Sequence, residues 1–153
     1  MKDLDKKIRK HIEEMNYDAV LLLLENRKDL DPYHTTLKGI CIQITKNPGY
    51  TPQDAESCFL KAIEIDGRYV RPYIELGYLY LTALKDKEKA EYFFDQAKEI
   101  LKDLLVETFM GDFQIKFESR RDASILKMLK DFNDSVMNHK DIIALHDVLK
   151  KYK

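Results

Sequence analysis

Two stretches of this 153-residue chain follow one pattern: AESCFLKAIEI at residues 55–65 and AEYFFDQAKEI at residues 90–100. Alanine, glutamate, phenylalanine, a second alanine, a second glutamate and isoleucine return in the same order after 35 residues. A fainter copy lies another 35 residues upstream, where Val20, Leu24 and Leu30 occupy corresponding apolar places. Return at a fixed distance of this size is typical of stacked supersecondary units, and such stacks favour a binding surface over a catalytic pocket.

Apolar residues recur at helical spacing throughout this part of the chain. A capping box is predicted where Thr51 precedes Pro52 and Asp54, because a threonine can cap a helix whose third residue is acidic. The spacing and the turn signals together predict helices that include residues 4–15, 18–29, 33–44 and 52–66, then a helix opened by Pro72 and a sixth that carries the second copy of the run.

The third unit carries the most detailed pattern. Its residues are Tyr73, Leu76, Gly77, Tyr80, Ala90, Phe94 and Ala97. This order resembles the tetratricopeptide (TPR) repeat, a helix–turn–helix unit of about 34 residues. The resemblance covers about residues 1–102 as three units, and it implies an all-α, TPR-like α-solenoid of about three helix pairs. One extra residue between Tyr80 and Ala90 and the lack of a closing proline depart from the pattern.

The repeat is lost after Leu105. The Gly111-Asp112 pair predicts a break in the helix, followed by a short irregular or extended stretch. Apolar spacing then predicts two capping helices, one over Ile125–Phe132 and one over Ile142–Leu149, because a repeat stack needs its last apolar face covered. We therefore expect a single domain over residues 1–153, with three helix pairs at 1–102 and a capping segment at 103–153.

Composition narrows the functional classes. The 26 lysines and arginines balance the 27 aspartates and glutamates, so no charge-driven nucleic-acid surface is expected. The run Ala19–Leu24 is far shorter than the roughly 18 apolar residues that span a bilayer, which predicts a cytoplasmic protein with no membrane partner. Cys41 and Cys58 lack a CxxC spacing and are expected to be small hydrophobic packing residues.

Catalytic and metal-binding patterns are weak in this sequence. The histidines at 11, 34, 139 and 146 lack the i, i+4 spacing with which a helix chelates zinc, and we expect them at exposed or rim positions. Neither a glycine-rich phosphate loop nor an HExxH run occurs. The sequence therefore predicts no enzyme, no catalytic residue, no metal site and no cofactor.

The TPR resemblance implies a binding groove, because the first helix of each repeat lines the concave surface of such proteins. The residues that it implies are Thr35, Lys38, Ile42, Arg71, Ile74, Tyr78 and Leu81. Tyr78 and Arg71 have the character of recognition hot spots. An alternative is that Ile74 and Leu81 pack against the C-terminal segment.

The function implied is a protein–protein interaction module, a monomer or weak homodimer, that captures a peptide, a helix or a protein loop. Two alternatives remain open. One is a dedicated bacterial secretion chaperone or toxin-immunity protein, which this size and repeat number resemble. The other is an enzyme or a regulatory domain with a site near residues 109–121.

Overall fold

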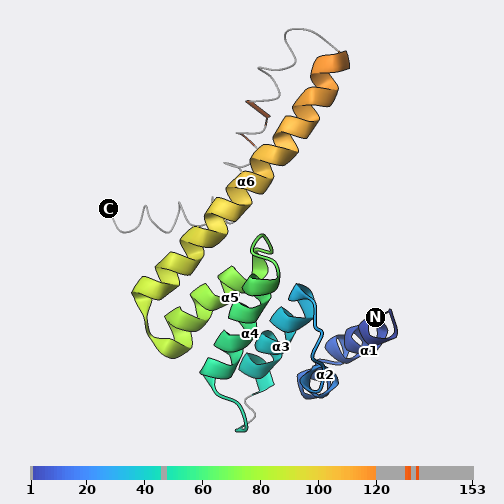
Figure 1. Cartoon of the computed structure of the whole chain (residues 1–153), viewed down its shortest axis with the longest axis vertical. Helices are drawn as coiled ribbons and strands as arrows, with labels where there is room; N and C mark the ends of the chain where they lie inside the picture. The colour runs from blue at the N-terminus through green and yellow to red at the C-terminus, as the bar shows by residue number, and fades with distance from the viewer. Residues whose placement is uncertain (1, 46–47, 120–129, 132–133, 135–153) are drawn as a thin grey trace. The chain divides into compact units, whose positions relative to one another are not determined.

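The computed structural model describes residues 2–45, 48–119, 130–131 and 134, and its regular structure there is entirely helical (Figure 1). The elements are α1 (Lys2–Glu13), α2 (Tyr17–Glu25), α3 (Pro32–Thr45), α4 (Pro52–Ile65), α5 (Arg71–Leu79), the π-helical turn η1 (Tyr80–Leu84) and α6 (Lys87–Ser119). The all-α expectation is thus confirmed for these residues. The chain forms two compact units, Met1–Asp103 and Leu104–Lys153. The predicted capping helices at 125–132 and 142–149 lie outside the described residues, apart from Lys130 and Asp131, which are helical and exposed.

Local caps explain where two of the helices begin. The backbone N–H of Asp54 donates to the Thr51 hydroxyl at 3.3 Å, and the Thr51 N–H donates to the Asp54 carboxylate at 2.7 Å. This pair is the predicted capping box, and α4 begins at Pro52 as expected. Asn16 caps α2 by accepting a hydrogen bond from the Ala19 N–H at 3.1 Å. That cap fixes the start of α2, which ends at Glu25 and is shorter than the sequence predicted.

Helices that follow one another in the first unit pack side by side. Contacts join α1 to α2, α2 to α3, α3 to α4 and α4 to α5, and α3 also contacts α5. The core between them contains fully buried side chains from four helices: Val20, Leu24, Cys41, Phe59 and Leu76. Burial of one large apolar side chain contributes roughly 1.5–3 kcal/mol, so these contacts hold the stack together.

The same glycine–phenylalanine contact occurs in two successive helix pairs. A Cβ atom on Gly39 of α3 would lie 2.6 Å from the ring of Phe59 in α4, and one on Gly77 of α5 would lie 2.6 Å from the ring of Phe94 in α6. Glycine is therefore needed for the close approach at both places. The sequence pattern singled out Gly77, Phe59 and Phe94 but missed Gly39.

The two contacts do not repeat at one fixed distance along the chain. The phenylalanines lie 35 residues apart, whereas the glycines lie 38 residues apart. The difference arises because residues 46–51 separate α3 from α4, while only Lys85 and Asp86 separate η1 from α6. A repeat length of 35 residues therefore aligns the second helices, α4 and α6, but does not align the first helices, α3 and α5.

The extra residue between Tyr80 and Ala90 lies in a π-helical turn. The Lys85 N–H donates to the Tyr80 carbonyl, and Lys85 adopts a left-handed conformation with φ of 57°. A hydrogen bond from residue i+5 to residue i encloses one residue more than the α-helical bond does. The turn thereby absorbs the insertion before α6 begins.

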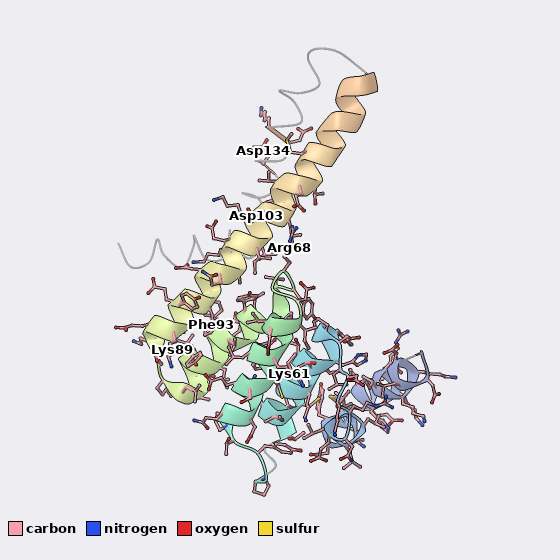
Figure 2. All side chains as sticks on the ribbon, in the orientation of Figure 1. Lys61, Arg68, Lys89, Phe93, Asp103 and Asp134 are labelled. Carbon is pink, nitrogen blue, oxygen red and sulfur yellow. The ribbon has the colours of Figure 1, made fainter. Side chains whose placement is uncertain are left out.

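Tyr80 connects this turn to α4 and α6 through side-chain contacts. Its side chain is 5% exposed, and its hydroxyl donates a hydrogen bond to Glu56 of α4. Its ring stacks on Phe93 of α6 with centroids 5.5 Å apart, and the Lys89 ammonium lies 5.0 Å from its centroid. Figure 2 labels Phe93 and Lys89 on α6. Burial, followed by the hydrogen bond to Glu56, raises the pKa of Tyr80 to about 12.

The predicted break at Gly111 is wrong, because α6 continues without interruption to Ser119. Gly111 has no positive φ, and a Cβ atom placed on it would meet nothing within 4 Å. A glycine in a helix costs only about 0.5–1 kcal/mol relative to alanine. The helical four-residue spacing of the phenylalanines at 109, 113 and 117 agrees with the observed helix, and their alternative interpretation as a strand does not.

Candidate binding face

Two hollows lie along α1, α3 and α5, which are the first helices of successive pairs. The hollow between α1 and α3 has a volume of about 820 Å³, and that between α3 and the start of α5 has a volume of about 300 Å³. Tyr33 borders both hollows and is 51% exposed. We call the surface that contains the two hollows the first-helix face. Its lining includes Ile12 and Glu13 of α1, Tyr33 and Ile40 of α3, and Tyr69 and Arg71 at the start of α5.

A buried histidine of α3 contacts an aspartate of α1 beneath this face. His34 is 3% exposed, and its Nδ1 and Nε2 atoms each lie 2.9 Å from a carboxylate oxygen, of Asp31 and Asp5 respectively. The His34 backbone N–H also donates to Asp31 at 2.8 Å. Because both ring nitrogens face acceptors, both contacts are hydrogen bonds when each nitrogen carries a proton.

The expectation that the histidines lie at exposed or rim positions is therefore wrong for His34. Asp31 stands three residues before His34 in the first turn of α3, and this local spacing was the one available signal. Asp5 is 29 residues away in the sequence, so the second contact depends on tertiary packing. The Asp31 and Asp5 carboxylates each contact a different ring nitrogen of His34. The described residues contain no cluster of three side chains able to hold a metal ion.

The four predicted groove residues of α5 and η1 lie at or near the surface. Tyr78 is 54% exposed and Leu81 is 43% exposed, while Ile74 is half-buried. Arg71 is exposed, lines the smaller hollow and pairs with Glu75 at 2.5 Å. The Tyr78 ring meets Phe94 edge to face with centroids 5.1 Å apart, so the exposed ring rests on the same phenylalanine that packs against Gly77.

The three predicted residues of α3 are placed differently. Thr35 and Ile42 are buried, at 3% and 6% exposed, and Lys38 is half-buried. The Thr35 hydroxyl donates to the Asp31 carbonyl at 2.8 Å, as part of the helix start. Thr35 and Ile42 border neither hollow of the first-helix face, so they do not contact a partner bound there.

The residues of α3 that do border the hollow follow from the glycine contacts. When Gly39 is matched with Gly77, Tyr33 corresponds to Arg71 and Ile40 corresponds to Tyr78. The predicted groove residues imply an offset of 36 residues between the first helices, as between Thr35 and Arg71, which is two fewer than the 38 that separate the glycines. Gly39 itself was the signal that could have set the register.

The two cysteines offer no activated nucleophile. Burial raises the pKa of Cys41 to about 12, with a smaller contribution from the negative charge of Asp18. Burial also raises the pKa of Cys58. A thiol is reactive as its thiolate, so both groups are held in the unreactive form.

Comparison of the chain with protein-family models, curated proteins and solved structures gives no match. Among the described residues, no helix combines the length and the apolar character needed to cross a bilayer. The first-helix face is thus defined by its own geometry: two adjoining hollows, exposed aromatic rings and a small number of charges.

Proposed function

We propose that this chain is a non-catalytic, TPR-like binding module that captures a peptide, a helix or a protein loop on the first-helix face. The observation that carries the proposal is the repeated contact of Gly39 with Phe59 and of Gly77 with Phe94. Equal packing within both pairs gives α3 and α5 equivalent outward faces, and these faces carry exposed rings at Tyr33 and Tyr78.

The energetic basis of capture lies in aromatic rings that are already held in place. Tyr78 rests on Phe94, and Tyr33 meets the buried ring of His34 with centroids 5.2 Å apart. Tyrosine gives a large contact area for little loss of side-chain entropy, and truncation of such an anchor typically costs about 2 kcal/mol or more of binding free energy. Apolar contact with the two tyrosines would supply the affinity.

Charges along the face would set the selectivity. The larger hollow is bordered by Arg9 and by three carboxylates, those of Asp5, Glu13 and Asp31, and the smaller one by Arg71. Arg71 is paired with Glu75, so its guanidinium offers its remaining donors rather than an isolated charge. A segment that crosses Tyr33 would meet both signs of charge, which favours a partner of mixed charge over a strongly basic or acidic one.

The test is selection of binding peptides from a random displayed library, followed by calorimetry with variants. We expect Tyr33→Ala and Tyr78→Ala each to weaken binding at least tenfold, since an anchor worth about 2 kcal/mol corresponds to roughly thirtyfold. Tyr92→Ala is the matched control, because Tyr92 is 57% exposed but lies on α6, the second helix of its pair, and not on α3 or α5. Peptides that bind both tyrosine variants as tightly as the control would move the interface elsewhere.

Purification from the native host distinguishes a general adaptor from a dedicated chaperone or immunity protein. A dedicated protein should be recovered with one client at equal stoichiometry, whereas an adaptor should be recovered with several unrelated proteins. In both cases the Tyr78→Ala variant should lose the partner.

A further inference from the structure

The larger hollow of the first-helix face combines an apolar lining with a charged rim. Its volume of about 820 Å³ lies within the roughly 300–1,000 Å³ that binding sites for small molecules occupy. Ile8 lies at its floor and is almost fully buried, whereas Ile12 is partly buried and Tyr33 is exposed. The hollow is therefore large enough for one long side chain, and its apolar contacts come mainly from Ile12 and Tyr33.

Negative charge predominates on this rim. Asp5, Glu13 and Asp31 supply three carboxylates, and Arg9 supplies one guanidinium. His34 also lines the hollow, and the carboxylates outnumber the cations even when this histidine is protonated. The described lining of the smaller hollow contains no acidic side chain. Negative charge is thus concentrated at the α1 end of the first-helix face.

The three carboxylates are accessible to a partner. The Asp5 and Asp31 side chains are 45% and 37% exposed. Each uses its Oδ1 atom in the contact with the His34 ring, which leaves Oδ2 as an acceptor. Glu13 is exposed and forms no ion pair with another described residue. Because His34 already holds two of the carboxylates in place, little further side-chain entropy is lost when they bind a cation.

We propose that the larger hollow receives a basic side chain of the captured segment, arginine in preference to lysine. This inference rests on the proposed function, since it names the chemistry of the partner at the same face. The aliphatic stem of the basic residue lies over Ile12, and its charged group meets the carboxylates of the rim. A planar guanidinium binds a carboxylate through two parallel hydrogen bonds and stacks on an aromatic ring, which Tyr33 offers. An ammonium is a compact charge without that fork geometry.

The position of the negative charge also orders the residues of the segment. Tyr33 borders both hollows, so the side chain that contacts it lies between them. The basic residue lies on the α1 side of this contact, and the part of the segment on the other side meets Arg71. A segment of mixed charge is thereby bound in one orientation.

A double-mutant cycle between the segment and Glu13 tests the proposal. The probes are peptides selected on the unmodified chain from a random displayed library and weakened by Tyr33→Ala. Each arginine of such a peptide is replaced in turn by citrulline, and each lysine by glutamine, and calorimetry measures binding to the unmodified chain and to Glu13→Gln. We expect one basic residue whose replacement weakens binding roughly three- to tenfold, and a similar effect of Glu13→Gln. The two changes together should weaken binding by less than the product of the two factors.

Glu14→Gln is the matched control for Glu13→Gln. It makes the same chemical change one residue further along, where the carboxylate lies 3.9 Å from Lys10 and 3.4 Å from His11. This variant should leave the affinity and the effect of the basic residue unchanged. Asp5 is kept intact in the test, because its replacement would also remove the contact with His34.

Reversal of charge gives a result that a purely structural role of Glu13 cannot produce. Glu13→Arg should weaken the original peptide by about tenfold or more, because like charges then meet in the hollow. Exchange of the coupled basic residue of the peptide for glutamate should restore part of this loss. Coupling to Glu13 together with this restoration would support the proposal.

Three results would overturn the proposal. Peptides that depend on Tyr33 but show no coupling to Glu13 would refute the basic occupant and leave the proposed binding face intact. If no selected peptide depended on Tyr33, the inference would be refuted, and if none depended on Tyr78 either, the proposed function would fall with it. A shift of the monomer–dimer equilibrium by Glu13→Gln, measured by sedimentation, would identify a second copy of this chain as the occupant instead.

Discussion

Gly39 and Gly77 each lie against an aromatic ring with no room for a methyl group. We expect Gly39→Ala and Gly77→Ala to lower the free energy of unfolding by about 1–3 kcal/mol, because the added carbon overpacks the contact. The effect should be larger at Gly39, since Phe59 is fully buried while Phe94 is only partly buried and has more freedom to shift. Urea unfolding followed by circular dichroism measures both values.

Gly111→Ala is the matched control for these substitutions. It makes the same chemical change in a helix, but nothing lies within 4 Å of the added atom. We expect no loss of stability and a local gain of about 0.5–1 kcal/mol, which should appear as a higher helix content. If Gly39→Ala and Gly77→Ala gained stability to the same extent as Gly111→Ala, helix propensity rather than ring contact would dominate at these glycines.

The two thiols, of which Cys41 is buried and Cys58 is partly buried, lead to a second prediction. The pKa of Cys41 is raised to about 12 by burial, so its thiol stays protonated at mildly alkaline pH, and Cys58 is shifted in the same direction. We expect the folded protein to react with Ellman's reagent near pH 8 much more slowly than the urea-unfolded chain does. Rapid release of two equivalents of chromophore by the folded protein would contradict this.

The same shift has a consequence for stability. In the unfolded chain Cys41 ionises near its ordinary pKa of 9.0, whereas the folded chain resists ionisation up to about 12. The contribution of the neutral thiol to stability is therefore complete below about pH 9 and is lost as the pH rises from 9 towards 12.

The element with the most explicit start signal is α4. Thr51→Ala removes the side chain that caps the helix, and we expect a loss of about 0.5–2 kcal/mol in the free energy of unfolding. Hydrogen bonds from the Thr51 side chain and backbone hold the pKa of Asp54 below its ordinary value of 3.8. The stability that the ionised Asp54 contributes is present above that value and is lost as the pH falls below it.

Measurement of unfolding by urea near neutral pH and near pH 3 checks both parts of this prediction. The unmodified chain should lose part of the cap contribution in acid, and Thr51→Ala should show a weaker dependence on pH over this range. An equal dependence in the two proteins would mean that Asp54 does not act through the cap.

Elements with strong local signals could be predicted from the sequence, and those that depend on distant parts could not. The start of α4 follows from Thr51, Pro52 and Asp54, which are adjacent in the chain. The continuation of α6 past Gly111 contradicts the prediction from the Gly111-Asp112 pair, because a single glycine costs a helix little when the residues around it keep helical spacing. The extra residue before α6 was recognised, but its placement in a π-helical turn depends on the packing of Tyr80 against Glu56 and Phe93.

At the scale of the whole molecule, the unit Met1–Asp103 contains the core and both hollows of the first-helix face. We expect a shortened chain that ends at Asp103 to unfold in urea with a single cooperative transition. The buried residues of α1 to α5 would remain together, and the part of α6 that carries Ala90, Phe94 and Ala97 would be retained. A gradual, non-cooperative loss of helix signal would instead mean that residues after 103 are needed for folding.

The candidate site could be predicted in part. The exposed positions of Arg71, Tyr78 and Leu81 agree with the expectation from the repeat pattern, because the third unit carries that pattern almost completely. In α3 the expected residues were displaced, since the length of the turn before α4 changes the offset between the first helices. The link from His34 to Asp5 joins positions 29 residues apart, and no local pattern indicated it.

The contact between Gly39 and Phe59 also limits how this chain can evolve. A larger side chain at 39 needs a smaller one at 59, because the two share one fixed volume between α3 and α4. Substitutions at these positions are therefore expected to be inherited as compensating pairs, and a lineage that acquires alanine at 39 should already have exchanged the ring at 59 for a shorter aliphatic group.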